Sequence, residues 1–220
     1  MILELKTAVR TICRKMGIIP ALHRVRMLWH SSDYEDTFSA ALLSAVRADD
    51  CVWDIGANVG YYTEQLSRRA RSVVAFEPVL ENITKIKARC LSNVECRKMA
   101  LGDREAELMI SQNGPYSSIV SSHALGNATY ETTTVMPGDA LVDLTPPDIV
   151  KIDVEGYEPE VIRGMHKLLS TARAAFIEVH FSLLASRGLA QQPAAIVRDL
   201  KHLGFTSVKW VDASHIEARR

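Results

Sequence analysis

A glycine-rich turn that begins with an acid is the feature of this sequence best suited to bind a ligand. It reads DIGANVG (54–60) and lies between a predicted strand and a predicted helix. Gly56 and Gly60 let the backbone turn tightly and approach a ligand closely. The spacing differs from GxGxxG, in which a helix N-terminus receives a pyrophosphate. Because Asp54 precedes the first glycine, the turn suits an ammonium or hydroxyl group better than a phosphate.

A second acid, Glu77, ends the next predicted strand and lies 21 positions after Gly56. In doubly wound sheets, an acid about 20 residues after the glycine turn binds the hydroxyls of a ribose. A carboxylate accepts hydrogen bonds from both hydroxyls and would repel a 2′-phosphate. Together, Asp54 and Glu77 indicate a nucleoside ligand that carries positive charge. S-adenosylmethionine fits this description, since it has a sulfonium, an amino acid end and a free ribose.

Five ionisable residues lie at the ends of two later predicted strands. Residues two apart on a strand share a face, so Lys151, Asp153 and Glu155 are expected on one face, and Glu178 and His180 on another. The two strands end over the same crevice, where the five groups are expected to converge. Unpaired buried charges are costly, and we therefore expect Lys151 to pair with Asp153, Glu178 or both.

His180 is the predicted catalytic base, because imidazole accepts a proton near neutral pH. Glu178 or Asp153 would orient it, and Lys151 would stabilise the alkoxide that develops on a hydroxyl acceptor. Two other interpretations stay open: an ion-pair network that fixes the strand ends, and a divalent metal held by Asp153, Glu178 and His180. Two acids and one histidine are a sparse set and the lysine argues against a cation, so we predict no metal.

Alternating strands and helices after residue 50 would position these groups. The predicted strands are 51–56, 72–77, 93–101, 148–154, 174–181 and 205–211, with weaker β segments at 105–111 and 132–136. The predicted helices are 58–69, 79–91, 157–169 and 193–203. This order predicts an α/β fold: a mostly parallel sheet of six to seven strands with helices on both faces. A seventh strand would have to come from residues 212–218.

Residues 1–48 form a predicted N-terminal helical extension, and residues 49–220 form the predicted ligand-binding domain. Six basic residues and one acid give residues 1–30 a net charge of +5, although the whole chain is neutral. We expect this segment to pack as a helix with its cations in water. A lid over the pocket, a dimer arm and a peripheral helix on an anionic membrane are the alternatives. The oligomeric state stays open, a homodimer included.

Composition excludes several classes of protein. The length of 220 residues and the 47% hydrophobic content favour one globular domain and exclude a disordered or fibrous chain. Balanced charge excludes a global positive field, so no nucleic-acid partner is expected. The four cysteines form no zinc-spaced cluster. Because neither a signal peptide nor a membrane span is recognisable, we predict a cytoplasmic protein.

Several segments match a known family in the family's order. They are VWDIGANVGYYT (52–63), VVAFEPVLEN (73–82), ALGD (100–103), the Ser117-Ser118 loop, DIVKIDVEGYEPEVIRG (148–164) and FIEVH (176–180). On these segments the chain resembles the FkbM family of S-adenosylmethionine-dependent methyltransferases, which have a Rossmann-like class I fold. Before the fourth strand only Asp139 and Leu141 carry over, and Tyr157 stands where the family often has histidine.

The resemblance implies a cofactor role for eight residues. The four that would hold the methionine part of S-adenosylmethionine are Asp54, Gly56, Asn58 and Gly60. Glu77 would bind the ribose hydroxyls, with Asn82 orienting that loop, and the turn Ala100–Asp103 would lie against the adenine.

The sequence thus predicts an S-adenosylmethionine-dependent O-methyltransferase. The resemblance implies a small-molecule or glycan acceptor: a hydroxyl of a sugar, glycolipid, polysaccharide or secondary metabolite. An NAD-dependent oxidoreductase is an alternative, against which the missing GxGxxG counts. A non-catalytic nucleoside-binding module is another, against which the intact glycines and acids count. The long loop 112–131, which contains Ser117 and Ser118, either reaches the substrate or cofactor or is a surface excursion.

Overall fold

The computed structural model describes residues 31–89, 91–111, 118–119 and 130–220. The chain divides into two compact units, Met1–Ser39 and Ala40–Arg220, and every described strand belongs to the second. Helix α3 (Ser31–Ala45) begins in the first unit and ends in the second. The basic segment 1–30 lies outside the described residues, so the predicted boundary at residue 48 and the role of the extension stay predictions. No described helix has the length and apolar character needed to cross a membrane.

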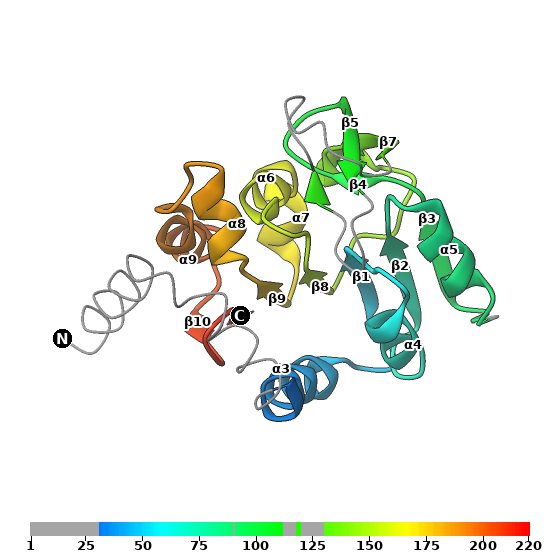
Figure 1. The fold of residues 1–220 in the computed structure, drawn as a ribbon. Coiled ribbons are helices and arrows are strands. Elements are labelled where there is room, and N and C mark those ends of the chain that lie inside the picture. Colours follow the sequence, from blue (N-terminus) through cyan, green and yellow to red (C-terminus); the bar gives the residue numbers. More distant parts are fainter. Residues whose placement is uncertain (1–30, 90, 112–117, 120–129) are drawn as a thin grey trace. The chain divides into compact units, whose positions relative to one another are not determined.

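The larger of two sheets forms the centre of the second unit, and its strand order is β10-β11-β9-β8-β1-β2-β3 (Figure 1). Its seven strands are β1 (Cys51–Ile55), β2 (Ser72–Phe76), β3 (Val94–Arg97), β8 (Ile149–Ile152), β9 (Ala174–Glu178), β10 (Ser207–Trp210) and β11 (His215–Arg219). All neighbours pair in parallel except β11, which is antiparallel to both β9 and β10. The predicted mostly parallel α/β sheet is therefore confirmed, and β11 is the seventh strand.

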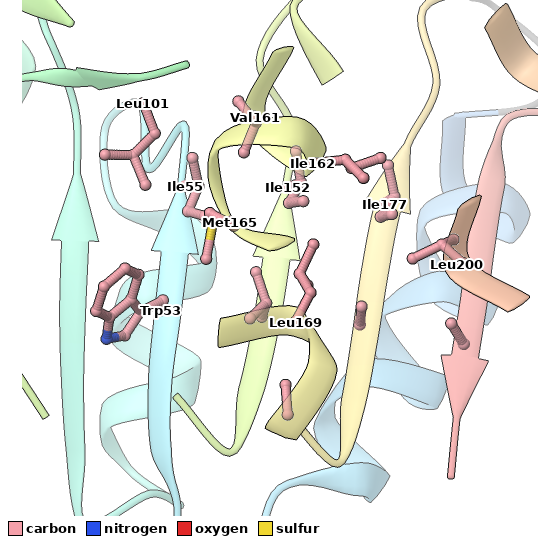
Figure 2. Close-up of a cluster of buried hydrophobic side chains, with 14 of the residues drawn as sticks. Trp53, Ile55, Leu101, Ile152, Val161, Ile162, Met165, Leu169, Ile177 and Leu200 are labelled. Carbon is pink, nitrogen blue, oxygen red and sulfur yellow. The ribbon is translucent and has the colours of Figure 1, made fainter. Parts of the chain in front are cut away.

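Helices cover both faces of this sheet. They are α4 (Tyr61–Ser67), α5 (Leu80–Lys87), α6 (Glu158–Gly164), α7 (His166–Thr171), α8 (Phe181–Ser186) and α9 (Gln192–His202). Alternate residues of a strand point to opposite faces. In β1, Trp53 and Ile55 point into the core under α6 and α7 (Figure 2), whereas Asp54 bonds to Thr63 of α4 on the other face.

The core under α6 and α7 brings together strands that are distant in sequence. Trp53 and Ile152 come from β1 and β8, and Val161 and Met165 come from α6 and its C-terminus (Figure 2). All four side chains are 0% exposed. Full burial of a side chain of this size stabilises the fold by about 1.5–3 kcal/mol. The packing holds the strand ends, and the turns that follow them, in fixed positions.

The predicted third strand, 93–101, is wrong as one element. It ends at Arg97, a short turn with a hydrogen bond from Met99 N to Arg97 O (3.0 Å) follows, and the chain then enters a second sheet. That sheet has the order β4-β7-β5-β6 and contains β4 (Ala100–Leu101), β5 (Ala106–Ser111), β6 (Ser118–Ile119) and β7 (Tyr130–Met136). Residues 100–101 leave the first sheet because their pairing partner is β7, which the local apolar pattern does not reveal.

One predicted helix and one predicted strand also have different bounds in the structure. The helix expected over 157–169 is broken at Met165, which has a φ of −119°, into α6 and α7. The strand expected over 174–181 ends at Glu178, and α8 begins three residues later. His180 is therefore the residue that precedes α8 and does not lie on the strand, so it cannot share a strand face with Glu178.

Gly56 is required where the turn after β1 meets the turn after β8. Its φ is +78°, and its N–H and that of Ala57 both donate to Phe76 O at 3.0 Å. A Cβ atom at Gly56 would lie 1.8 Å from the carbonyl oxygen of Asp153. The position therefore needs both the left-handed conformation and the absence of a side chain.

We expect Gly56→Ala to destabilise the protein far more than Gly188→Ala. Gly188 also has a positive φ, +74°, but a Cβ atom there meets nothing within 4 Å. The control variant should lose only the conformational cost of about 1–2 kcal/mol, whereas Gly56→Ala adds a backbone clash. Urea unfolding of both variants measures the two losses. Equal losses would show that the contact with Asp153 is unimportant.

Candidate active site

A cleft opens at the carboxyl ends of β1, β2 and β8, the edge at which doubly wound sheets bind their ligands. The empty space within it, including solvent at its open mouth, is about 660 Å³. Five of the eight predicted cofactor residues line it: Gly56, Asn58, Glu77, Asn82 and Ala100. The ends of separate strands therefore contribute to one site, as the sequence predicts.

Glu77 is a buried carboxylate at the polar end of the cleft, with 4% of its surface exposed. Its Oε2 accepts from Asn58 N (2.9 Å), and its Oε1 accepts from Val79 N (2.9 Å) and from Asn82 Nδ2 (3.2 Å). Burial raises the pKa of Glu77, and the three hydrogen bonds oppose that rise. A carboxylate offers about four acceptor sites. Three are used to fix its orientation, so one remains for a ligand hydroxyl.

Several apolar side chains also line the cleft. Met99 directly precedes β4 and Leu101 lies in it, Ile110 comes from β5, and Val154 and Tyr157 follow β8. This wall exists because the chain leaves the first sheet after β3 and forms β4. A flat, mainly apolar ring system fits such a wall, and a polar sugar fits the end at Glu77.

Asp54 and Lys151 form an ion pair beneath the cleft and do not line it. Asp54 is 0% exposed and Lys151 2%. The Lys151 Nζ lies 3.1 Å from Asp54 Oδ1 and 3.5 Å from Asp153 Oδ2, and it donates to Gly56 O at 3.1 Å. Thr63 Oγ1 donates to Asp54 Oδ2 at 2.6 Å, a partner that the sequence analysis missed. The pair therefore braces the Gly56 turn from below.

The expected pairing of Lys151 with Asp153, Glu178 or both is confirmed for Asp153. Asp153 is a partner, but no ion pair joins Lys151 to Glu178 among the described residues. Burial alone would lower the pKa of Lys151, but the charges of Asp54 and Asp153 outweigh it and raise that pKa above its ordinary value. Lys151 therefore stays an ammonium.

Two other predicted cofactor residues lie outside the cleft lining. Gly60 precedes α4 with a φ of +86°, and a Cβ atom there would lie 2.8 Å from Ile86. Asp103 pairs with Arg163 at 2.8 Å. Ser117 and the side chain of Ser118 fall outside the part of the chain that the structure describes. The cofactor roles of all of these residues stay predictions.

His180 brings four carboxylates together next to the cleft. Its Nε2 lies 3.3 Å from Glu155 Oε2, 3.7 Å from Asp153 Oδ1 and 3.8 Å from Glu178 Oε1. Its Nδ1 lies 2.7 Å from Glu158 Oε1. The convergence that the sequence predicts is therefore present, with Asp153 and Glu155 also lining the cleft.

Glu155 belongs to this cluster, but it does not lie on the strand that the sequence predicts for it. The strand β8 ends at Ile152, and Glu155 lies in the following turn with a φ of +51°. A shared strand face with Lys151 is therefore the wrong reason for its position. Glu158 is not among the residues predicted from the sequence. Its place as an acid in the first turn of a helix, directly after the Glu155-Gly156 turn, is the one local signal for it.

Burial and the neighbouring charges shift the pKa values of His180 and Glu155. Burial lowers the pKa of His180, but the hydrogen bond that its Nδ1–H donates to Glu158 and the charges of Asp153 and Glu155 raise it overall to about 9. Burial raises the pKa of Glu155 to about 7, which the charge of His180 opposes and Asp153 reinforces. At neutral pH, His180 is an imidazolium and Glu155 is poised to gain or lose a proton.

The pKa values of two neighbouring acids, Asp153 and Glu178, shift in opposite directions. Burial raises the pKa of Asp153, despite the nearby charge of Lys151. Burial acts the same way on Glu178, but the hydrogen bond and charge of His215 lower its pKa overall. The His215 Nε2 lies 3.4 Å from Glu178 Oε2. Glu178 is thus held by His215 as well as by His180.

Three side chains of the cluster lie close enough to surround one cation. Ligand atoms of Asp153, Glu155 and His180 fall within 4.8 Å of one another. A protonated imidazole donates hydrogen bonds and has no lone pair for a metal. The positive charge of protonated His180 can therefore balance the carboxylates of Asp153 and Glu155 without a metal ion. The absence of a metal stays our prediction.

Comparisons with known proteins agree with this geometry. A family model described as the methyltransferase FkbM domain matches residues 54–207. The hexuronic acid methyltransferase AglP of Haloferax volcanii is 28% identical over 169 residues, which cover 71% of this chain and 67% of AglP.

Two solved structures share the fold. Methyltransferase FkbM from Methylobacillus flagellatus has a TM-score of 0.58 at 13% identity, over 82% of this chain. The match covers 47% of that protein, so this chain spans about half its length. A putative methyltransferase from Streptococcus mutans, solved in complex with SAH, has a TM-score of 0.54 at 11% identity, over 84% of this chain and 96% of that one.

We expect Lys151→Met to cost about 3–5 kcal/mol of unfolding free energy, because it leaves Asp54 as an unpaired buried charge. The matched control is Lys85→Met, which removes an exposed pair with Glu81 on α5. Such pairs contribute about 0.3–0.5 kcal/mol. Urea unfolding followed by circular dichroism measures both losses. Similar losses in the two variants would contradict the bracing role of Lys151.

Proposed function

The chain belongs to the FkbM methyltransferase family, and we propose that it transfers the methyl group of S-adenosylmethionine to a hydroxyl oxygen of a sugar. The observation that carries this proposal is the continuity of the site. Glu77, at one end of the cleft, is shaped to bind hydroxyls, and Asp153 and Glu155 connect the cleft to the His180 cluster. The cofactor would therefore bind next to the carboxylates that could accept the proton of the acceptor hydroxyl.

The cleft residues fit S-adenosylmethionine. Glu77 has an acceptor site left for a ribose hydroxyl, and the wall around Met99, Leu101 and Ile110 fits an adenine. The Gly56 turn allows close approach of the backbone, and the nearby carboxylates favour a positively charged ligand. When bound, S-adenosylmethionine supplies a methyl group on a positively charged sulfur. The protein has to align the acceptor and accept its proton.

We assign the proton of the acceptor hydroxyl to Glu155 rather than to His180. Both are candidates by position, but Glu155 lines the cleft and has a pKa of about 7. A base works best when its pKa lies near the working pH. His180, with a pKa of about 9, is protonated there. Its Nε2–H faces Glu155 and stabilises the ionised form that accepts the proton.

A sugar acceptor is supported by the relationship to AglP, whose name specifies hexuronic acid. The relative is 28% identical, so the acceptor of this chain is a proposal of class: the hydroxyl of a hexuronic acid or a related sugar, free or within a glycan. The family match removes the NAD-dependent oxidoreductase from consideration. A nucleoside-binding module without activity would bind the cofactor and transfer nothing.

We expect Glu77→Gln to weaken binding of S-adenosylhomocysteine about 10- to 100-fold, because hydrogen bonds to a charged group contribute about 1.5–3 kcal/mol. Isothermal titration calorimetry measures this, with Glu81→Gln on the exposed face of α5 as the control that binds normally. Methyl transfer from labelled S-adenosylmethionine to uronic and neutral sugars, with and without EDTA, tests the reaction. Absence of binding by the unmodified protein would refute the cofactor, and binding without transfer to any sugar would refute the acceptor class.

We expect a bell-shaped pH profile for kcat/KM. The rate should rise with pH through about 7 as Glu155 ionises, and fall above about 9 as His180 loses its Nε2 proton. Glu155→Gln should remove the rising limb and lower the rate about 100-fold or more. A rate that instead rises through about 9 would identify neutral His180 as the base.

A further inference from the structure

Glu158 is a buried carboxylate with a defined pair of partners. It begins α6 and has 0% of its surface exposed. One oxygen, Oε1, lies 2.8 Å from Gly156 N and 2.7 Å from His180 Nδ1. Burying a carboxylate is costly unless donors satisfy it. These two N–H groups satisfy Oε1 and hold the side chain in place, whereas Oε2 is buried without a hydrogen-bond partner among the described residues.

Both partners lie on backbone that is itself fixed. Gly156 has a φ of +90°, and a Cβ atom there would lie 2.8 Å from the Cβ of Leu183 in α8. Arg187, directly after α8, donates to Gly156 O. His180 directly precedes α8. The turn after β8 is thus packed against α8, and Glu158 connects this turn to the imidazole.

The contact at Nδ1 decides which nitrogen of His180 changes its protonation state. A carboxylate at 2.7 Å accepts a hydrogen bond from Nδ1–H, so Nδ1 keeps its proton in both forms of the ring. The proton that comes and goes is on Nε2, which faces Glu155. The groups around the ring are Asp153 and Glu155 after β8, Glu158 on α6, Glu178 on β9 with His215 of β11 behind it, and Lys151 beneath Asp153.

We infer that Glu158 is a positioning residue, which fixes His180 through Nδ1 so that the Nε2–H group is directed at Glu155. The inference rests on the proposed function, because it gives the Glu158–His180 pair its purpose in proton transfer. Loss of the Glu158 charge would leave the imidazolium less stable. Neutral His180 would then present a lone pair at Nε2 to the Glu155 carboxylate, a repulsive contact.

A neighbouring acid provides a matched control. Glu160 lies on the same turn of α6 and is 8% exposed. Its carboxylate pairs with Arg187 at 2.8 Å and with Arg163 at 3.5 Å, and no ion pair joins it to His180 among the described residues. Glu160→Gln therefore removes a buried acid from the same helix without touching the imidazole.

The test is Glu158→Gln, in which the amide oxygen still accepts from Gly156 N and His180 Nδ1 but the charge is gone. Nuclear magnetic resonance of the imidazoles in the whole protein, assigned with His180→Gln, gives the tautomer and pKa of His180. We expect Nδ1–H in the unmodified protein. We expect the pKa of His180 to fall by about 1–3 units in Glu158→Gln and to remain unchanged in Glu160→Gln.

The kinetic readout is separate from folding. In Glu158→Gln the falling limb of the pH profile should move to lower pH by the same amount, which lowers kcat/KM at pH 8 about twofold for a shift of 1 unit and about tenfold for a shift of 2 units. The KM for S-adenosylmethionine should not change, since Glu158 does not line the cleft.

Three outcomes would overturn the inference. One is an unchanged His180 titration in a folded Glu158→Gln protein, and another is an equal shift in Glu160→Gln. The third, a neutral His180 protonated at Nε2, is visible in the unmodified protein and needs no variant to fold. A shifted titration in a protein that methylates no sugar hydroxyl would instead refute the proposed function.

Discussion

The buried ammonium of Lys151 is the constraint on which the rest of the site depends. It lies where β1 and β8 run side by side, in the register that sets Asp54 opposite Lys151. By bonding to Asp54, to Asp153 and to the carbonyl of Gly56, it joins the turn after β1 to the turn after β8. One turn lines the cleft that also contains Glu77, and the other begins the acid cluster. The two halves of the site thus keep their spacing because one cation binds both.

The carboxylates around His180 also affect one another electrostatically. Asp153, Glu155, Glu158 and Glu178 gather around a single imidazole, and like charges this close raise the cost of ionising each one. The structure offsets part of that cost with His180 and His215. Burial is the main cause that raises the pKa of Glu155 to about 7, and the remaining excess of negative charge adds to it. A group that exchanges a proton near pH 7 therefore arises where carboxylates are both buried and crowded.

The second sheet sets the shape of the cleft. Residues 100–101 leave the first sheet and pair with β7, although their apolar pattern favours a continuous third strand. Met99 and Leu101 then line the cleft together with Ile110 of β5. The size and apolar character of this end of the site follow from that one change of pairing partner.

The sequence by itself determined the order of strands and helices, the glycine turn and the place of Glu77, because these depend on local periodicity and on the rule that parallel strands end at one edge. It also identified His180 and its acidic neighbours as a cluster. Only the tertiary structure decided what each of them does. Asp54 is a buried partner of Lys151, 97 residues away in the chain, and Glu158 holds His180 from another helix. Which charge meets which depends on strand register and on the path of the turns, and burial sets how strongly each pKa responds.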